Sequence, residues 1–136
     1  MRKIMLGLVA LTLAACGGDS TGPIAGAVGT WNLKTLDGSP LPFTTAFNAG
    51  PPVFRQEIAA DAWVLSSNGT WTESMTTRDT NGSTVTSQTT AYNGTWSEAN
   101  GAVTITSPTR GTIIATITGN SMIYSAGADI FVYARQ

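Results

Sequence analysis

Residues 68–101, NGTWTESMTTRDTNGSTVTSQTTAYNGTWSEANG, decide the fold expected for this chain. Threonine and serine alternate there with apolar or aromatic residues, and a period of two is typical of a β-strand with one buried face. Asn-Gly pairs, which tolerate the positive φ of tight hairpin turns, begin at positions 68, 81, 93 and 100. The stretch predicts two long antiparallel strands, 70–79 and 84–97, with the pair at position 93 as a bulge or bend inside the second.

The same alternation continues on both sides of this stretch. It predicts six further strands, at 28–36, 55–66, 102–107, 111–118, 121–125 and 129–135. Residues 55–63 also carry helical features, such as the i, i+4 step from Glu57 to Asp61, but Trp63-Val64-Leu65 before a turn favours a strand. Because nearly all connections are short, neighbouring strands should pair antiparallel in chain order. The expected fold class is all-β, a small eight-stranded antiparallel up-and-down barrel.

Residues 37–54 form the one long connection between the predicted strands. Prolines at positions 40, 42, 51 and 52 exclude a central strand there. Three phenylalanines, Phe43, Phe47 and Phe54, indicate that the segment packs on something. Two alternatives follow: a lid over one barrel mouth, in which Phe43 and Phe47 could contact a ligand, or a loop folded back to plug the core.

Alternation also gives a candidate interior, which includes Trp31 and Leu33, Val103 and Ile105, Ile113, Ala115 and Ile117, and Met122 and Tyr124. Two strands stay ambiguous, because a slip of one residue turns every side chain to the other face. In the strand 55–66, either Trp63 and Leu65 or Ala62 and Val64 point inward. In the last strand, either Phe131 and Tyr133 or Ile130 and Val132 do so.

Trp71, Glu73 and Met75 share one face of the strand 70–79 and are the candidate ligand contacts inside the barrel. A carboxylate on this face would be partly buried and would need a cation. The expected partner of Glu73 is Arg78, Arg55 or Arg135. A structural role for Glu73, or exposure at the barrel rim, is the alternative to a role in ligand binding.

Composition excludes several classes of function. From Cys16 onward the formal charge is −3, which disfavours nucleic-acid binding because that binding depends on clustered cations. The chain has no histidine, the commonest general base and metal ligand, and no serine in a Gly-x-Ser-x-Gly motif. The carboxylates are scattered rather than clustered as a hard metal site needs. We therefore expect no enzyme, no metal and no cofactor.

The N-terminal residues have the layout of a secretory signal. Arg2 and Lys3 precede an apolar run at 4–13, and small residues lead to Cys16, the single cysteine. Leu-Ala-Ala-Cys resembles the lipobox of bacterial lipoproteins, which implies cleavage before Cys16 and lipidation of its thiol. The predicted organisation is a signal peptide at 1–15, a lipidated cysteine and flexible tether at 16–26, and a barrel domain at 27–136. In lipoproteins of this type an Asp after the cysteine is associated with inner-membrane retention, so by this resemblance Gly17 favours the outer membrane, provided that the host is didermic.

Gly-Thr-Trp occurs three times, beginning at positions 29, 69 and 94. The first copy, Gly29-x-Trp31, with Arg135 at the end of the last strand, is similar to the lipocalin pattern. That resemblance implies that Trp31 closes one barrel end and that Arg135 stacks on it. The chain is shorter than typical lipocalins, and it has no disulfide and no evident C-terminal helix. Since an eight-stranded barrel can be filled by its own side chains, these departures bear on whether a roomy cavity exists.

The resemblance implies a membrane-anchored protein of the cell envelope that binds a small hydrophobic or amphipathic molecule without catalysis. Its partners would be the membrane, through the lipid anchor, and a small ligand or an envelope protein. The alternative is a module for protein–protein interaction or inhibition that acts through residues 37–54 and has a solid interior.

Overall fold

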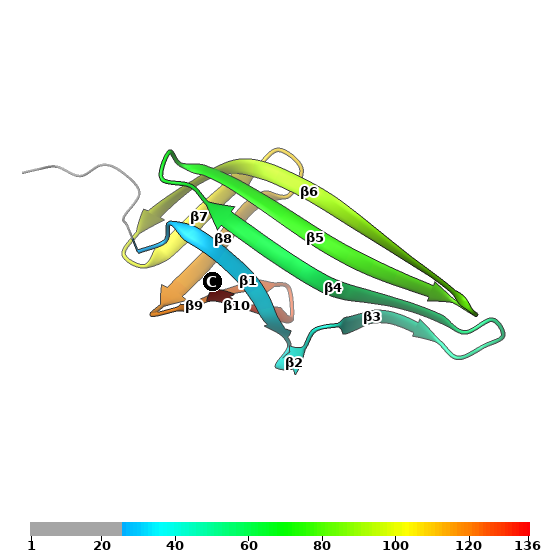
Figure 1. The fold of residues 1–136 in the computed structure, drawn as a ribbon. Coiled ribbons are helices and arrows are strands. Elements are labelled where there is room, and N and C mark those ends of the chain that lie inside the picture. The colour runs from blue at the N-terminus through cyan, green and yellow to red at the C-terminus, as the bar shows by residue number, and fades with distance from the viewer. Residues whose placement is uncertain (1–25) are drawn as a thin grey trace, which may run out of the picture.

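A computed structural model describes residues 26–136 (Figure 1). The signal peptide, Cys16 and nearly all of the tether predicted above lie outside the described residues. One antiparallel sheet contains all the strands: β1 (Gly29–Leu36), β2 (Ser39–Pro40), β3 (Phe43–Asn48), β4 (Phe54–Leu65), β5 (Thr70–Asn81), β6 (Thr84–Ala99), β7 (Ala102–Ser107), β8 (Gly111–Thr118), β9 (Ser121–Ala126) and β10 (Asp129–Arg135). Residues 26–136 contain no helix that is long and apolar enough to span a membrane.

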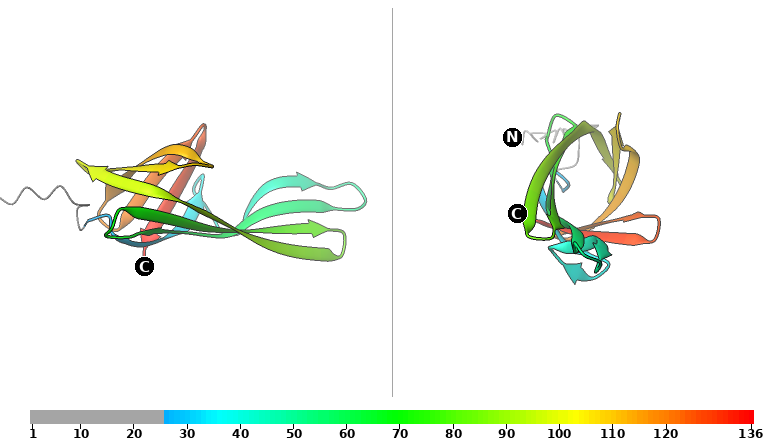
Figure 2. Two further views of the ribbon diagram at one scale, coloured as in Figure 1. Left: turned by 90° about the horizontal axis from the view of Figure 1, so that it is seen from above. Right: turned by 90° about the vertical axis from the view of Figure 1, so that its right-hand side faces the viewer.

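Eight of these strands close into a barrel. From β4 to β10 each strand pairs with its neighbour in the chain, and β1 pairs with β10 on one edge and with β4 on the other. Closure joins Gly29–Asn32 of β1 to Ala62–Leu65 of β4, and the right-hand view of Figure 2 shows the strands surrounding a common axis. The predicted all-β, eight-stranded antiparallel up-and-down barrel is confirmed.

The structure also settles the alternatives that alternation left open. Residues 54–65 form a strand and not a helix. Trp63 and Leu65 are buried, whereas Val64 is exposed, so the inward set of β4 is the one that contains tryptophan. In β10, Tyr133 is buried and Ile130 is exposed. Register is fixed here because only one of the two faces of each strand carries large rings that can fill the interior.

The Asn-Gly pair at position 93 makes neither a hairpin nor a bulge. β6 runs through it and stays in register with β5. The neighbouring strand β7 explains why a glycine is present at position 94. A Cβ at Gly94 would overlap with the carbonyl oxygen of Thr106 in β7, at 2.1 Å. Glycine is therefore required at this position so that β7 can approach β6 closely.

Residues 37–54 form neither a lid nor a plug, although Leu41 packs against the barrel core. They contain β2 and β3, and β3 pairs with β4 at the edge of the sheet. Beyond the barrel, β3 and the adjoining parts of β4, β5 and β6 extend as a four-stranded projection, here called the arm, which the left-hand view of Figure 2 shows leaving the barrel. The prolines flank β3 rather than interrupt it, and an edge strand needs backbone hydrogen bonds on one side only.

The barrel is filled mainly by aromatic rings. Trp31, Trp63, Trp71 and Tyr133 are the largest fully buried side chains, and the tryptophan of each Gly-Thr-Trp copy points inward. Trp63 lies at the centre, with ring centroids 5.7 Å from Trp71 and 4.7 Å from Tyr133. Such contacts add to the free energy gained by burying the apolar surface.

One barrel end has the contact that the lipocalin resemblance implies. The guanidinium carbon of Arg135 lies 4.5 Å from the centroid of the Trp31 ring. Arg135 also donates to the carbonyl of Val28, at 3.1 Å, and to that of Gly26. The indole N–H of Trp31 donates to the carbonyl of Ala27 at 2.9 Å. These bonds tie the chain before β1 to the end of β10.

Candidate functional site

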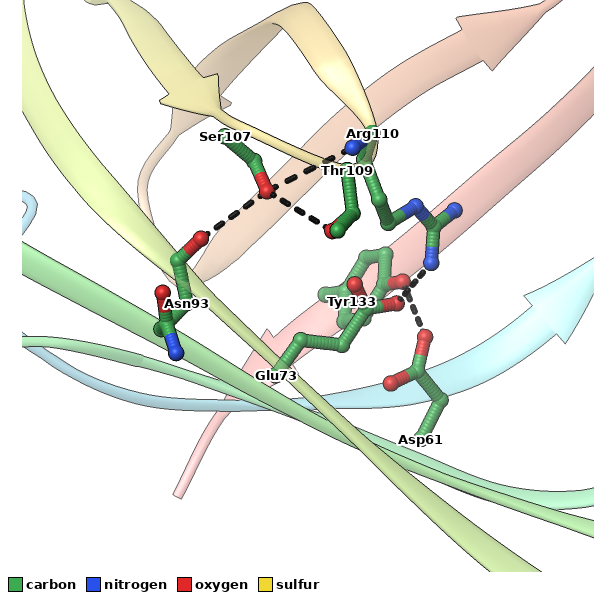
Figure 3. A network of polar contacts seen from close by, with 7 residues as sticks. All are labelled: Asp61, Glu73, Asn93, Ser107, Thr109, Arg110 and Tyr133. Atoms are coloured by element: carbon green, nitrogen blue, oxygen red, sulfur yellow. Dashed lines mark hydrogen bonds and ion pairs between the residues drawn. The ribbon is translucent and has the colours of Figure 1, made fainter.

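Four polar residues meet inside the aromatic interior (Figure 3). Asp61 comes from β4, Glu73 from β5 and Tyr133 from β10, and Arg110 comes from the turn between β7 and β8. We call these four residues the polar cluster. Asp61 is 5% exposed and Glu73 is 2% exposed. Because burial of an unpaired carboxylate is strongly unfavourable, both acids need compensation inside the barrel.

Two short hydrogen bonds provide part of this compensation. The Tyr133 hydroxyl donates to Asp61 Oδ2 at 2.6 Å, and Arg110 Nη1 donates to Glu73 Oε1 at 2.6 Å in a buried ion pair. The remaining oxygens, Asp61 Oδ1 and Glu73 Oε2, have no hydrogen-bond partner among the described residues. The indole N–H groups of Trp63 and Trp71 are likewise without one. The interior thus holds two free acceptors and two free donors.

The two carboxyl groups influence each other's protonation. Burial raises the pKa of Asp61 to about 7, and the negative charge of Glu73 adds to this effect. Burial also raises the pKa of Glu73, although the nearby Arg110 guanidinium opposes the rise. Asp61 therefore titrates close to neutral pH.

Arg110 is held in place by the turn that carries it. The Ser107 hydroxyl donates to the carbonyl of Asn93 at 2.9 Å and accepts the backbone N–H of Arg110 at 3.4 Å. The guanidinium carbon lies 4.9 Å from the centroid of the Tyr92 ring. Figure 3 shows the side chain descending from the turn towards Glu73. Backbone anchoring, an ion pair and an aromatic contact together fix the guanidinium at the barrel mouth.

The barrel wall opens beside Arg110. β8 and β9 pair only between Ala115–Thr118 and Ser121–Tyr124, so the first residues of β8 have no partner on that side. A cavity of about 240 Å³ lies along this seam. It is lined by Arg110, Thr112, Ile113, Ile114, Tyr124, Ser125 and Ala126. The seam cavity therefore has both polar and apolar walls, and the arginine of the polar cluster is one of its lining residues.

The predicted ligand contacts are only partly brought together. Trp71 and Glu73 lie in the interior, and Met75, farther along β5, is half-buried. Phe43 and Phe47 lie on β3, opposite Ile58 and Arg55 of β4, so they belong to the arm and do not line the seam cavity. Phe47 is 62% exposed.

The predicted partners of Glu73 were wrong. Arg78 and Arg55 instead bind Glu57, with N–O distances of 2.8 and 3.5 Å. These arginines lie too far along the arm, because the register of β4 and β5 places Arg78 opposite Glu57. Arg135 stacks on Trp31 at the barrel end.

Three members of the cluster were not singled out as site residues from the sequence. Asp61 could have been, because it is two residues before Trp63 and four before Leu65 on the inward face. Tyr133 was one of two alternatives for the last strand and was considered only as an apolar ring. Arg110 carries no local signal, since it lies in a turn, 37 positions from Glu73. Only the closure of the barrel brings the two together.

Asp61 makes stability depend on pH, which gives a first prediction. Its pKa is higher in the folded than in the unfolded chain, so between about pH 4 and 7 the folded state binds more protons and stability falls as the pH rises. We expect a loss of about 2 to 3 kcal/mol between pH 5 and 8. Asp61→Asn should remove most of this dependence, and urea melts at the two pH values measure it. An equally steep loss in Asp61→Asn would contradict the assignment.

The described residues contain no group of three or more Cys, Asp or Glu side chains that could hold a metal ion. The site can instead supply an arginine beside the seam cavity and, deeper in the barrel, two partly satisfied carboxyl groups and two indole N–H groups. Comparisons with models of protein families, with curated proteins and with solved structures find no match for this chain.

Proposed function

We propose that this chain is a lipid-anchored protein of the cell envelope whose barrel binds a small amphipathic molecule without catalysis. The observation that carries the proposal is the seam cavity, because Arg110 both lines it and pairs with Glu73 of the polar cluster, where Glu73 Oε2 and Asp61 Oδ1 lack partners. Buried polar groups are almost always satisfied in folded proteins. Ordered water would satisfy these atoms, whereas a ligand in the seam cavity would contact Arg110, the member of the polar cluster that lines it.

The volume of the seam cavity supports a small ligand. The seam cavity, about 240 Å³, is below the usual range for sites that take drug-sized molecules. Its apolar part is formed by Ile113, Ile114 and the Tyr124 ring, and Arg110 supplies the charged group. We therefore propose a molecule with one polar group directed at Arg110 and a short apolar part along the seam.

Mass spectrometry tests this function. Residues 20–136 are expressed without the anchor, purified without detergent, and measured under native and denaturing conditions. The expected result is a small molecule released only on denaturation. Ala126→Trp, which fills the seam cavity, should abolish the release of the small molecule. Ala128→Trp lies in the next turn and outside the cavity lining, so it should leave the release unchanged. A bare protein mass in every sample would contradict ligand binding.

The anchor is tested separately at Cys16. Cys16→Ser should leave the precursor uncleaved and without lipid, because the thiol that carries the first acyl group is gone. Several acyl chains make membrane attachment stable, whereas one short chain does not. Cell fractionation with intact-mass measurement follows the change. A variant of mature size that still sediments with membranes would overturn the anchor.

The arm favours a second candidate function, a protein–protein interaction. It exposes Phe47, Val53 and Val85, none of which belongs to the core cluster of the barrel. The strand β3 of the arm lies within residues 37–54, the segment expected to act in a protein–protein interaction under the alternative drawn from the sequence. Crosslinking in cells, with the wild-type chain and with Phe47→Asp, tests this function. A crosslinked species that is lost in Phe47→Asp is the expected result, and one that persists unchanged would exclude a contact at this surface.

A further inference from the structure

β6 presents a long strand edge that no other strand covers in the described part of the chain. Its 16 residues pair with β5 from Thr84 to Thr95, but on the other side β7 pairs only with Thr95–Ala99. The Ser107 hydroxyl donates a hydrogen bond to the carbonyl of Asn93, so this carbonyl is not free. Residues 84–92 therefore form what we call the open edge, a row of backbone donors and acceptors directed away from the sheet.

The open edge lacks the features that usually prevent strands from pairing between molecules. Residues 84–92, TVTSQTTAY, contain no charge, proline or glycine, and the chain has no Lys, Arg, Asp or Glu between Asp79 and Glu98. Residues 84–89 are exposed. Natural edge strands are normally protected by lysine, proline, a bulge or shortness. An edge of this length and composition is suited to pairing with another strand.

The other edge of the same arm is protected. β3 has six residues and a register shift between Thr44 and Ala46. Prolines lie close on both of its sides, at positions 40, 42, 51 and 52. Both edges belong to the same four-stranded projection, so the difference is specific to β6. Protection of one edge and not the other indicates that β6 is the edge used for contact.

We propose that a second copy of this chain pairs with the open edge, antiparallel about a two-fold axis, so that the two arms form one continuous sheet. A two-fold contact brings the same surface of each copy together. Centred on Gln88, the pairing sets Val85 opposite Ala91, Thr86 opposite Thr90 and Ser87 opposite Thr89. No like charges face each other, and β-branched residues oppose one another, which favours strand pairing.

The charge pattern favours a second copy as the occupant. A partner strand with charged residues would lose hydration without gaining an ion pair, because the open edge offers no charge. A strand with a free, uncharged, proline-free edge is needed, and β6 itself is such a strand. This inference depends on the arm alone and not on the proposed ligand site or anchor.

Disulfide crosslinking tests the pairing in the full-length chain within cells. In an antiparallel pair, residues directly opposite have Cα atoms about 4.5 to 5.5 Å apart, which a disulfide can join. Gln88→Cys should therefore give a crosslinked dimer on mild oxidation. The wild-type chain controls for Cys16, and Ser74→Cys, exposed on β5 but flanked by β4 and β6, should stay monomeric.

The register gives a sharper test. Val85→Cys and Ala91→Cys should each fail to crosslink, because the two copies of residue 85 lie about 20 Å apart at the strand rise per residue. The double variant Val85→Cys with Ala91→Cys should crosslink. A charge variant gives an independent test. Gln88→Lys sets lysine opposite lysine and should raise the dissociation constant of the dimer by about fivefold. Ser74→Lys should leave that dissociation constant unchanged. Absence of a Gln88→Cys dimer, or crosslinks only to a different protein, would overturn the proposal.

Discussion

Replacing Arg110 with alanine is expected to lower the free energy of unfolding by about 3 to 5 kcal/mol, because it leaves a buried carboxylate without its cation. Glu73 is almost fully buried, and the Arg110 guanidinium is its ion-pair partner at 2.6 Å. Removing one member of such a pair is far more damaging than removing both. The loss should be smaller at acid pH, where protonation neutralises Glu73, and denaturant melts at pH 4 and 8 would measure both values.

Two controls separate this effect from a general loss of charge. Arg55→Ala removes a more exposed arginine from its 3.5 Å contact with Glu57 and should cost less than about 1 kcal/mol. The double variant Glu73→Gln with Arg110→Met removes both charges and should recover most of the loss. If the double variant is as unstable as Arg110→Ala, the ion pair is not the reason for the loss.

Replacing Trp31 with alanine is expected to cost about 3 to 5 kcal/mol, the range for emptying a large buried aromatic site. Trp31 is fully buried, covered by Arg135 and hydrogen-bonded to the chain before β1. Its removal would open one barrel end and release both contacts. In a domain of this size such a loss is a large part of the total stability.

A conservative variant at the same position identifies the cause. Trp31→Phe keeps a ring under Arg135 but loses the indole donor to the Ala27 carbonyl, so it should cost clearly less than Trp31→Ala. Urea melts of both variants measure the difference. A cost below about 1 kcal/mol for Trp31→Ala would show that this end of the barrel does not depend on the ring.

Most of the barrel could be predicted from the sequence, because its signals are local. The predicted strands 102–107, 111–118 and 129–135 coincide with β7, β8 and β10, and the others differ by one or two residues at their ends. Alternation and Asn-Gly turns act over a few residues and need no tertiary context. Strand order followed from short connections.

The site was harder to predict because its contacts are long-range. The ion pair of Arg110 with Glu73 and the hydrogen bond from Tyr133 to Asp61 join residues 37 and 72 positions apart. Register shifts also defeat simple alternation: in β4 the step between Ile58 and Ala60 changes the pairing, so that Glu57 lies opposite Arg78. The edge strand β3 was missed because prolines surround it.

Because residues 62–65 of β4 already close the barrel, the length of the arm can differ without any change in the barrel. In the arm, β4, β5 and β6 continue barrel strands beyond that closure, and the Asn81-Gly82 turn joins β5 to β6 at the far end. Residues can therefore be added to or removed from β5 and β6 in matched pairs without altering the wall, provided that each strand changes by two so that the inward and outward faces are kept. Each such step moves the tip by about 7 Å. Arm length is thus a spacing parameter that can vary between sequences while the barrel stays the same.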